Sequence, residues 1–157
     1  MLLLAPLALA GCGLQPMYAG GGNGNVARSL AGIAISPIEG QSGWLVRNAL
    51  ADRLGAKGNG TRYRLDIRLD DRVEGLGQLS NDTITRERRT LRARYQLVDQ
   101  QSGAVLLDAT AGSDAGFDVV NSEYAVIAAE QTALENLSQE VADQIVTRIS
   151  VRLRESR

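Results

Sequence analysis

The chain has 157 residues, one cysteine and no histidine, and its formal net charge at pH 7 is −1. This length suffices for a compact domain with a real core, and one cysteine cannot form a disulfide within a single copy. The lack of histidine excludes the commonest general base and metal ligand, and the near-zero charge argues against nucleic-acid binding.

An apolar run opens the chain and ends in Leu9-Ala10-Gly11-Cys12. Such a run ending in small residues is typical of a secretory signal, and it is far shorter than the ~20 residues of a transmembrane helix. The cysteine could instead be a buried core thiol. Its position resembles the bacterial lipoprotein signal, however, in which residues 1–11 are removed and Cys12 carries the lipid. Two or more acyl chains hold a protein stably on a membrane surface.

Residues 12–29 are expected to form the lipidated end and a flexible tether, because the segment is rich in glycine. The glycines lack a preceding strand and a following Gly-Lys-Ser/Thr, so they do not predict a phosphate loop. Alternating isoleucines predict a short strand within 30–38. The segment 41–55 is expected to be a helix with Ser42 as its N-cap and Gly55 at its end. Its apolar positions are Trp44, Leu45, Ala49, Leu50 and Leu54.

Three strands and a long helix follow. Side chains alternate between apolar and charged over 62–73, and a second strand is predicted over 83–98. A turn at Asp99–Gly103 leads to a third strand over 104–111. From Ser122 to the end the period is helical. The apolar stripe of this helix consists of Tyr124, Ile127, Ala128, Leu134, Leu137, Val141, Ile145, Ile149 and Leu153.

The order β-α-β-β-β-α predicts an α+β fold for residues 30–157. We expect a two-layer sandwich in which two helices pack on one face of a four-stranded mixed sheet, with the first strand-helix-strand unit as a right-handed crossover. The other face of the middle strands would be rich in arginine. The candidate binding residues are Arg62, Arg64, Arg68, Arg86, Arg88, Arg92 and Arg94.

No enzyme activity is predicted. Once the cysteine is acylated, Cys-His and Ser-His-Asp catalysis are both excluded. Asp66, Asp70, Asp71 and Glu74 would permit a paired-carboxylate hydrolase, but carboxylates interleaved with arginines are more typical of a solvated strand face. No metal and no cofactor other than the lipid on Cys12 are expected.

Several segments together resemble the lipopolysaccharide-assembly lipoprotein family, LptE. Residues 11–18, Gly-Cys-Gly-Leu-Gln-Pro-Met-Tyr, resemble the family's opening Gly-Cys-Gly-Phe-x-Pro-Leu-Tyr. The hairpin at 93–103 is similar to its Tyr-x-Leu-x-Asp…Thr-Gly segment. Residues 117–130 resemble the entry to the last helix of alphaproteobacterial members, and 144–153 resemble its close.

The resemblance implies a lipid-anchored protein on the periplasmic face of the outer membrane. Its implied partners are the LptD β-barrel, which such proteins plug and help to assemble, lipopolysaccharide, which they help to deliver to the outer leaflet, and the membrane itself. The arginines could bind lipid A phosphates. They could equally pair across strands with acids such as Asp66 and Glu87, remain solvated, or contact the barrel lumen.

Two other functions remain open from the sequence. A periplasmic accessory lipoprotein that activates a peptidoglycan synthase or serves a lipid-transport ATPase would share the anchor and the size but would need no barrel. A lipid carrier would need a deep apolar cavity in place of a solid core.

Overall fold

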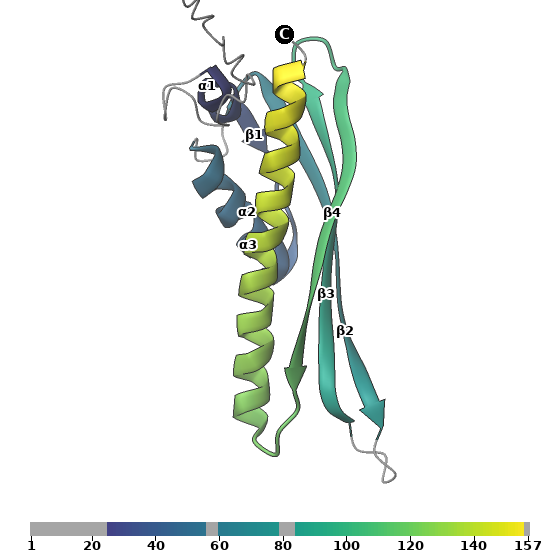
Figure 1. Cartoon of the computed structure of the whole chain (residues 1–157). Helices are drawn as coiled ribbons and strands as arrows, with labels where there is room; N and C mark the ends of the chain where they lie inside the picture. The colour runs from purple at the N-terminus through teal and green to yellow at the C-terminus, as the bar shows by residue number, and fades with distance from the viewer. Residues whose placement is uncertain (1–24, 56–59, 79–83, 156–157) are drawn as a thin grey trace, which may run out of the picture.

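The computed structural model describes residues 25–55, 60–78 and 84–155. Four strands form one sheet in the order β1-β2-β3-β4 (Figure 1). The elements along the chain are α1 (Asn25–Ala31), β1 (Ile33–Ile35), α2 (Gly40–Leu54), β2 (Tyr63–Gln78), β3 (Ile84–Asp99), β4 (Val105–Asp118) and α3 (Glu123–Glu155). The first pair of strands is parallel and the other two pairs are antiparallel. The predicted α+β class, with a mixed four-stranded sheet and helices on one face, is confirmed.

The start of the domain differs from the prediction. Residues Asn25–Ala31 form a helix, where the sequence indicated a tether up to residue 29 and a strand from residue 30. Leu30 belongs to this helix and its side chain is buried, and the strand comprises only Ile33–Ile35. Two alternating isoleucines are too short a signal to locate the strand's first residue. The predicted signal and lipidation site, Cys12, lie outside the described residues and remain predictions.

Helix α2 begins at Gly40, one residue before the predicted segment. Its N-cap is Glu39, which makes no side-chain capping bond, so the prediction of Ser42 as N-cap is wrong. Gly55 ends the helix as predicted, with φ 69° and its N–H bonded to the Ala51 carbonyl at 3.2 Å. Trp44 is 63 % exposed and does not join the packed side. Successive helical residues are about 100° apart, so Trp44, two positions before the buried Val46, points to the opposite side of α2.

Strands β2 and β4 extend beyond their predicted ends at residues 73 and 111. The added residues are mostly polar or glycine, so they carry no alternating apolar signal. They are held by pairing with β3, which matches Gln78 with Ile84 and Asp118 with Arg86. The pairing with β3 thus determines the length of these strands.

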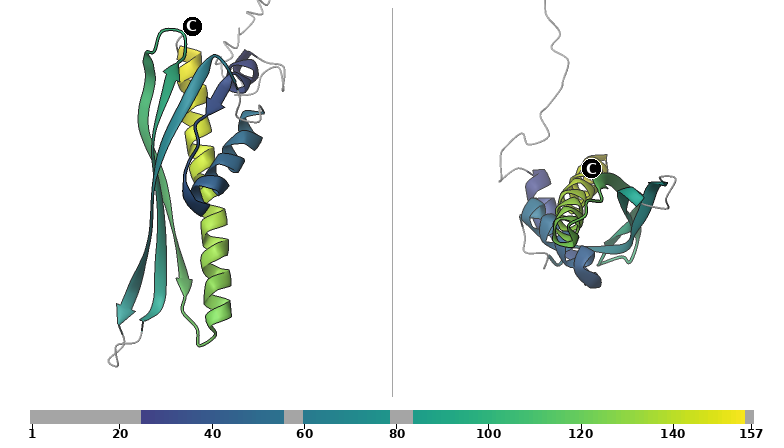
Figure 2. Two further views of the ribbon diagram at one scale, coloured as in Figure 1. Left: turned by 180° about the vertical axis from the view of Figure 1, so that it is seen from behind. Right: turned by 90° about the horizontal axis from the view of Figure 1, so that it is seen from below.

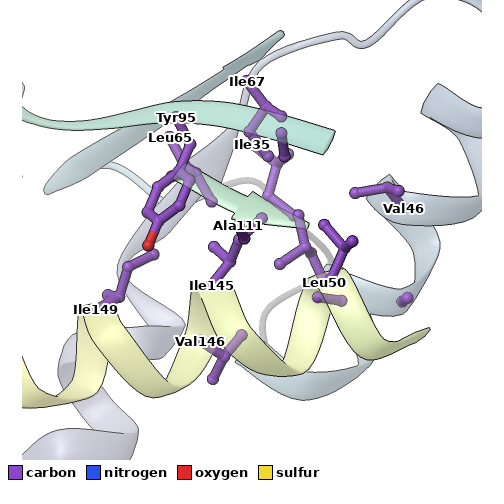
Figure 3. Close-up of a cluster of buried hydrophobic side chains, with 14 of the residues drawn as sticks. Ile35, Val46, Leu50, Leu65, Ile67, Tyr95, Ala111, Ile145, Val146 and Ile149 are labelled. Carbon is purple, nitrogen blue, oxygen red and sulfur yellow. The ribbon is translucent and has the colours of Figure 1, made fainter. Parts of the chain in front are cut away.

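One hydrophobic core lies between the sheet and the helices. Strand residues such as Leu65 and Tyr95 meet Val46 and Leu50 of α2 and Ile145 of α3 (Figure 3). Figure 2 shows that α2 lies beside only the upper half of α3, so the lower half of the sheet is faced by α3 alone. Within the described residues, no helix is long and apolar enough to cross a membrane.

The predicted stripe of α3 is only partly buried. From Leu134 onwards its residues belong to the core. Tyr124 is 84 % exposed, Ile127 is 57 % exposed, and Ala128 is also exposed, so the prediction is wrong for the first turns. These turns lie in the half of the molecule that α2 does not reach, where no second helix is present to complete a core (Figure 1).

Helix α3 also bonds to the edge of β4 through one row of side chains, namely Glu140, Gln144, Arg148 and Arg152. The Gln144 side chain bonds Gly112 twice: its amide nitrogen donates to the Gly112 carbonyl at 3.2 Å, and its oxygen accepts from the Gly112 N–H at 3.1 Å. The Ser113 hydroxyl donates to the Glu140 carboxylate. Residues four apart lie along one side of a helix, so the row follows the strand.

The other two members of the row bond to carbonyls nearer the start of β4. Arg148 donates to the Thr110 carbonyl at 3.2 Å, and Arg152 donates to the Leu106 carbonyl at 2.8 Å. Edge strands present unpaired backbone groups that invite another strand. Four of these groups, on Leu106, Thr110 and Gly112, are occupied by side chains of α3, so this part of the edge is closed.

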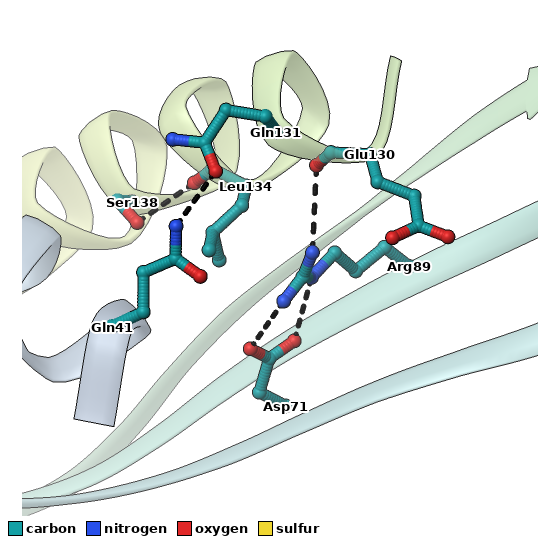
Figure 4. Close-up of polar contacts among 7 residues, drawn as sticks. All are labelled: Gln41, Asp71, Arg89, Glu130, Gln131, Leu134 and Ser138. Atoms are coloured by element: carbon teal, nitrogen blue, oxygen red, sulfur yellow. Dashed lines mark hydrogen bonds and ion pairs between the residues drawn. The ribbon is translucent and has the colours of Figure 1, made fainter. Parts of the chain in front are cut away.

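A partly buried ion pair supports the lower half of the molecule (Figure 4). Arg89 of β3 donates through two nitrogens to both oxygens of Asp71 of β2, each at 2.8 Å, and a third contact reaches the Glu130 carbonyl of α3 at 3.4 Å. A bidentate pair of this kind fixes orientation as well as supplying charge attraction. Arg89 therefore faces the helices and ties two strands to α3.

Replacing either of two residues of α3 by aspartate tests this packing. Leu134 is fully buried, so Leu134→Asp should lower the free energy of unfolding by on the order of 4 kcal/mol, because an unpaired charge would be buried. Tyr124→Asp, the matched control in the exposed turn, should change it by less than about 0.5 kcal/mol. Urea unfolding measures both. Equal losses would show that the whole stripe is packed.

Candidate functional site

The face of the sheet that points away from the helices is its outer face. Six of the seven predicted arginines lie on it and are exposed. The seventh, Arg62, precedes β2, and its guanidinium lies 5.0 Å from the ring centroid of Tyr63. The sequence analysis omitted Arg72, which the alternation of β2 also places on the outer face.

The outer face is rich in arginine but close to neutral. Seven arginines of β2 and β3 stand among six carboxylates on β2 and β4. These carboxylates are Asp66, Asp70, Glu74, Asp108, Asp114 and Asp118. The sequence analysis compared the arginines only with acids up to Glu87, and so missed the aspartates that β4 places beside them.

Most of these arginines are paired. Along β2, Arg64 bonds Asp66 at 3.0 Å and Arg72 bonds Asp70 at 2.9 Å. The predicted cross-strand pairs with Asp66 and Glu87 are therefore wrong. The partner of Asp66 lies on its own strand, and Glu87 lies opposite the buried Phe117 on the helix-covered face.

The cross-strand pairs join β3 to β4. Arg94 bonds Asp108 at 3.2 Å, and Gln96 donates to the same carboxylate at 2.9 Å. Further along, Arg86 lies 3.8 Å from Asp118, and Arg88 lies 3.8 Å from Asp114. Aspartates of β4 thus neutralise both ends of the arginine row on β3.

At Arg92, in the middle of the row, β4 offers no carboxylate, and Asp70, which lies opposite Arg92 on β2, bonds Arg72 instead. Between Asp108 and Asp114, the outer positions of β4 are Thr110 and Gly112, which lie opposite Arg94 and Arg92. No carboxylate of the described residues lies within 4.0 Å of Arg92. The positive charge of β3 is least balanced at this point.

Arg68 adds to this charge. It lies directly opposite Arg94 in the pairing of β2 with β3, and within the described part of the chain it too has no carboxylate partner within 4.0 Å. Like charges in direct cross-strand opposition are destabilising. We call Arg68, Arg92 and Arg94 the arginine cluster. The repulsion between Arg68 and Arg94 lowers the stability of the fold, and a bound anion would relieve it.

The surface around the arginine cluster is hollowed. One shallow cleft of about 480 Å³ is lined by Ser36, Asp66, Arg68, Arg94 and Gln96, among others. A second of about 560 Å³ is lined by all three cluster arginines together with Thr110 and Gly112. A Cβ atom at Gly112 would lie 3.1 Å from Cγ of Arg92. The glycine therefore lets the stem of Arg92 lie close against β4.

The electrostatics keep these groups charged. The hydrogen bond to Asp108 raises the pKa of Arg94, and the bonds from Arg94 and Gln96 lower the pKa of Asp108. Partial burial alone would raise the pKa of Asp66, but bonds from Arg64 and Ser36 hold it below its usual value. Guanidinium groups bind phosphate in bidentate geometry. The arginine cluster is thus suited to a phosphorylated ligand.

No group of three or more metal-ligating side chains comes together among the residues that the structure describes. The carboxylates Asp66, Asp70, Asp71 and Glu74, considered in the sequence analysis, are not gathered into one site. Asp71 faces the helices and bonds Arg89, whereas the other three lie on the outer face.

Comparison with known proteins identifies the family. A profile of the family described as Lipopolysaccharide-assembly, LptE, matches residues 30–149. The chain belongs to the LptE family. No match is found among curated protein sequences.

Three solved structures share the fold of this LptE-family chain. A protein of Caulobacter crescentus CB15 described as a lipoprotein has 24 % identity and a TM-score of 0.71, over 82 % of this chain and 96 % of that one. A minor lipoprotein of Acinetobacter baumannii has 19 % identity and a TM-score of 0.62, over 76 % and 90 %. Rare lipoprotein B of Shewanella oneidensis has 11 % identity and a TM-score of 0.60, over 80 % and 98 %.

The carboxylate pKa values predict how stability depends on pH. Asp108 and Asp143, which bonds Arg53, have pKa values below the ordinary value. A lowered carboxylate pKa stabilises the fold above the unfolded value of about 3.9, and this contribution is lost as the pH falls through the folded value. The free energy of unfolding should therefore stay flat from pH 5 to 8, since the chain has no histidine, and fall below about pH 4.

Urea unfolding at a series of pH values measures this dependence. Asp143→Asn removes one of the titrating groups and should make the fall below about pH 4 less steep. A loss of stability that began near pH 6 would contradict the assignment of the stabilising charges to these carboxylates.

Proposed function

We propose that this protein is a lipid-anchored, non-enzymatic component of the outer membrane that plugs and assembles an LptD-type β-barrel and assists lipopolysaccharide delivery. The family match supports a role in lipopolysaccharide assembly. The three similar structures are described as lipoproteins, which agrees with lipidation at Cys12. The anchor would hold the domain at the periplasmic face of the membrane.

The arginine cluster carries the proposal of direct contact with lipopolysaccharide. Lipid A bears phosphates, and Arg68 and Arg92 have no carboxylate partner within 4.0 Å among the described residues. Charge-assisted hydrogen bonds to a phosphate would satisfy them and screen Arg68 from Arg94. The paired arginines around the cluster would contribute less, since each already bonds a carboxylate.

The other functions have weaker support. A lipid carrier needs a deep apolar cavity, whereas here the space between sheet and helices is filled by side chains such as Leu65, Tyr95 and Ile145. The two clefts at the arginine cluster are shallow and open to solvent, and charged side chains line both. A synthase activator would share the anchor, but the match to the lipopolysaccharide-assembly family favours the barrel partner.

Complementation in cells depleted of the protein tests the proposal. Depletion should leave the barrel misassembled and surface lipopolysaccharide reduced, and the wild-type chain should restore both. The double variant Arg68→Gln, Arg92→Gln should restore barrel assembly but not lipopolysaccharide export, because it removes the unpaired guanidinium groups and leaves the core intact.

The matched control is Arg86→Gln, Arg88→Gln, which removes the same charge from the same face and should restore both properties. Equal loss with both double variants would indicate general attraction between positive charge and an anionic lipid. If neither impaired export, the protein would be a structural plug without phosphate contacts. Normal surface lipopolysaccharide after depletion would refute the transport role and favour synthase activation.

A further inference from the structure

The two edges of the sheet differ. The edge of β4 is closed between Leu106 and Gly112 by side chains of α3. The edge of β2 is paired with β1 only over Tyr63–Leu65, and one further bond joins the Ser36 N–H to the Leu65 carbonyl at 3.0 Å. Beyond this point no described strand pairs with β2 on this side, and the β1–α2 connection and the start of α2 lie across a cleft from Ile67, Leu69 and Asp71.

The bonds to β1 show which backbone groups point to this edge. The Tyr63 N–H donates to the Gly32 carbonyl at 3.1 Å, and the Leu65 carbonyl accepts from Ser36. Successive strand residues direct their backbone groups to opposite sides, so every second residue after Leu65 also points outwards. These residues are Ile67, Leu69, Asp71, Val73 and Gly75. Within the described part of the chain no hydrogen bond reaches them from that side.

The side chains along this free edge form a self-complementary pattern. The outer face carries Arg68, Asp70, Arg72 and Glu74 in order. When the segment is laid antiparallel to a copy of itself about Asp71, Arg68 faces Glu74 and Asp70 faces Arg72. Each of the four cross-strand pairs thus joins opposite charges, which stabilises paired strands.

We propose that a second copy of this chain binds here, by antiparallel pairing of the two β2 edges with Asp71 on the two-fold axis. The outward-pointing residues then meet as hydrogen-bonded pairs, and the charged residues meet as the closer, non-hydrogen-bonded pairs. The contact is isologous, as in most homodimers. This inference does not depend on the proposed function.

The pairing satisfies groups that the single chain leaves open. Neither Arg68 nor Glu74 has an oppositely charged partner within 4.0 Å among the described residues, and the second copy supplies one to each. Val73, which is 43 % exposed, would be covered by Leu69 of the other copy. The two Asp71 carboxylates that approach the axis are each already bonded to Arg89.

On the outer face this register fits the charges better than either adjacent one. A shift of the pairing one step in one direction sets Asp70 against Asp70 and Arg68 against Arg72. A shift one step in the other direction sets Arg72 against Arg72 and Asp70 against Glu74. Both shifts bring like charges together, which destabilises paired strands.

The shape of the edge admits another strand. A cleft of about 390 Å³ beside it is lined by residues of the β1–α2 connection, including Pro37 and Ile38, and by Ile67, Leu69 and Asp71 of β2. Since Ser36 closes the edge at Leu65, pairing ends where Gly75 faces Ile67. Glycines at 75 and 77 allow the end of each hairpin to bend away from β1 of the other copy.

Charge reversal tests the proposal on the full chain in mild detergent, by sedimentation at concentrations up to about 100 μM, since so small an interface binds weakly. The wild type should form dimers. Glu74→Arg and Arg68→Glu each turn two attractive pairs into repulsive ones and should weaken dimerisation by about tenfold or more. An equimolar mixture of the two variants should restore dimerisation. In a dimer with one copy of each variant, every cross-strand pair again joins opposite charges.

The matched controls are Asp114→Arg and Arg88→Glu, which make the same charge changes on the outer face away from the β2 edge and should leave dimerisation unchanged. Circular dichroism shows whether each variant is folded. A mixture that fails to associate would overturn the proposal, as would control variants that weaken association as much as the edge variants. A wild type that stays monomeric would overturn it too, and would favour a strand from another protein as the occupant of this edge.

Discussion

Everything else in the structure depends on the double contact of α3 with the sheet. Its apolar stripe from Leu134 to Leu153 covers the inner face, and Gln144, Arg148 and Arg152 of its polar row bond the backbone of β4. The apolar contacts supply most of the stabilisation, because burial of apolar area is the dominant favourable term. The polar contacts fix where the helix lies along the strand and satisfy backbone groups that would otherwise be open.

This arrangement leaves the outer face free to carry charge. Since the core is complete on the other side, residues of β2 and β3 that point outwards need not bury apolar area. Most of them form ion pairs that contribute little individually. The exceptions are Arg68 and Arg92 of the arginine cluster, where β4 offers Thr110 and Gly112 in place of aspartate. Unbalanced positive charge in the middle of a row whose two ends are neutralised is typical of a functional site.

The sequence predicted the sheet, both major helices and the outward position of the arginines, because these follow from alternating or helical apolar patterns. It did not predict which side chains are buried or paired where this depends on tertiary packing. Tyr124 and Ile127 continue the stripe of α3, but among the described residues no second helix lies there to complete a core. Trp44 lies on the side of α2 opposite Val46. The pairing state of each arginine depends on aspartates up to some thirty residues further along the chain. The alternation places Asp114 and Asp118 on the outer face only once β4 is known to extend past residue 111.

Hydrogen exchange resolved at single amides tests most directly the claim that α3 closes one edge of the sheet and leaves the other open. In the full chain at concentrations too low for association, the Gly112 amide should exchange slowly, because it is bonded to the Gln144 side chain at 3.1 Å. The amides of Leu69 and Val73 should exchange fast, while those of Arg68 and Arg72, which point to β3, should be protected. Rapid exchange at Gly112, or equal protection of both edges, would contradict this account.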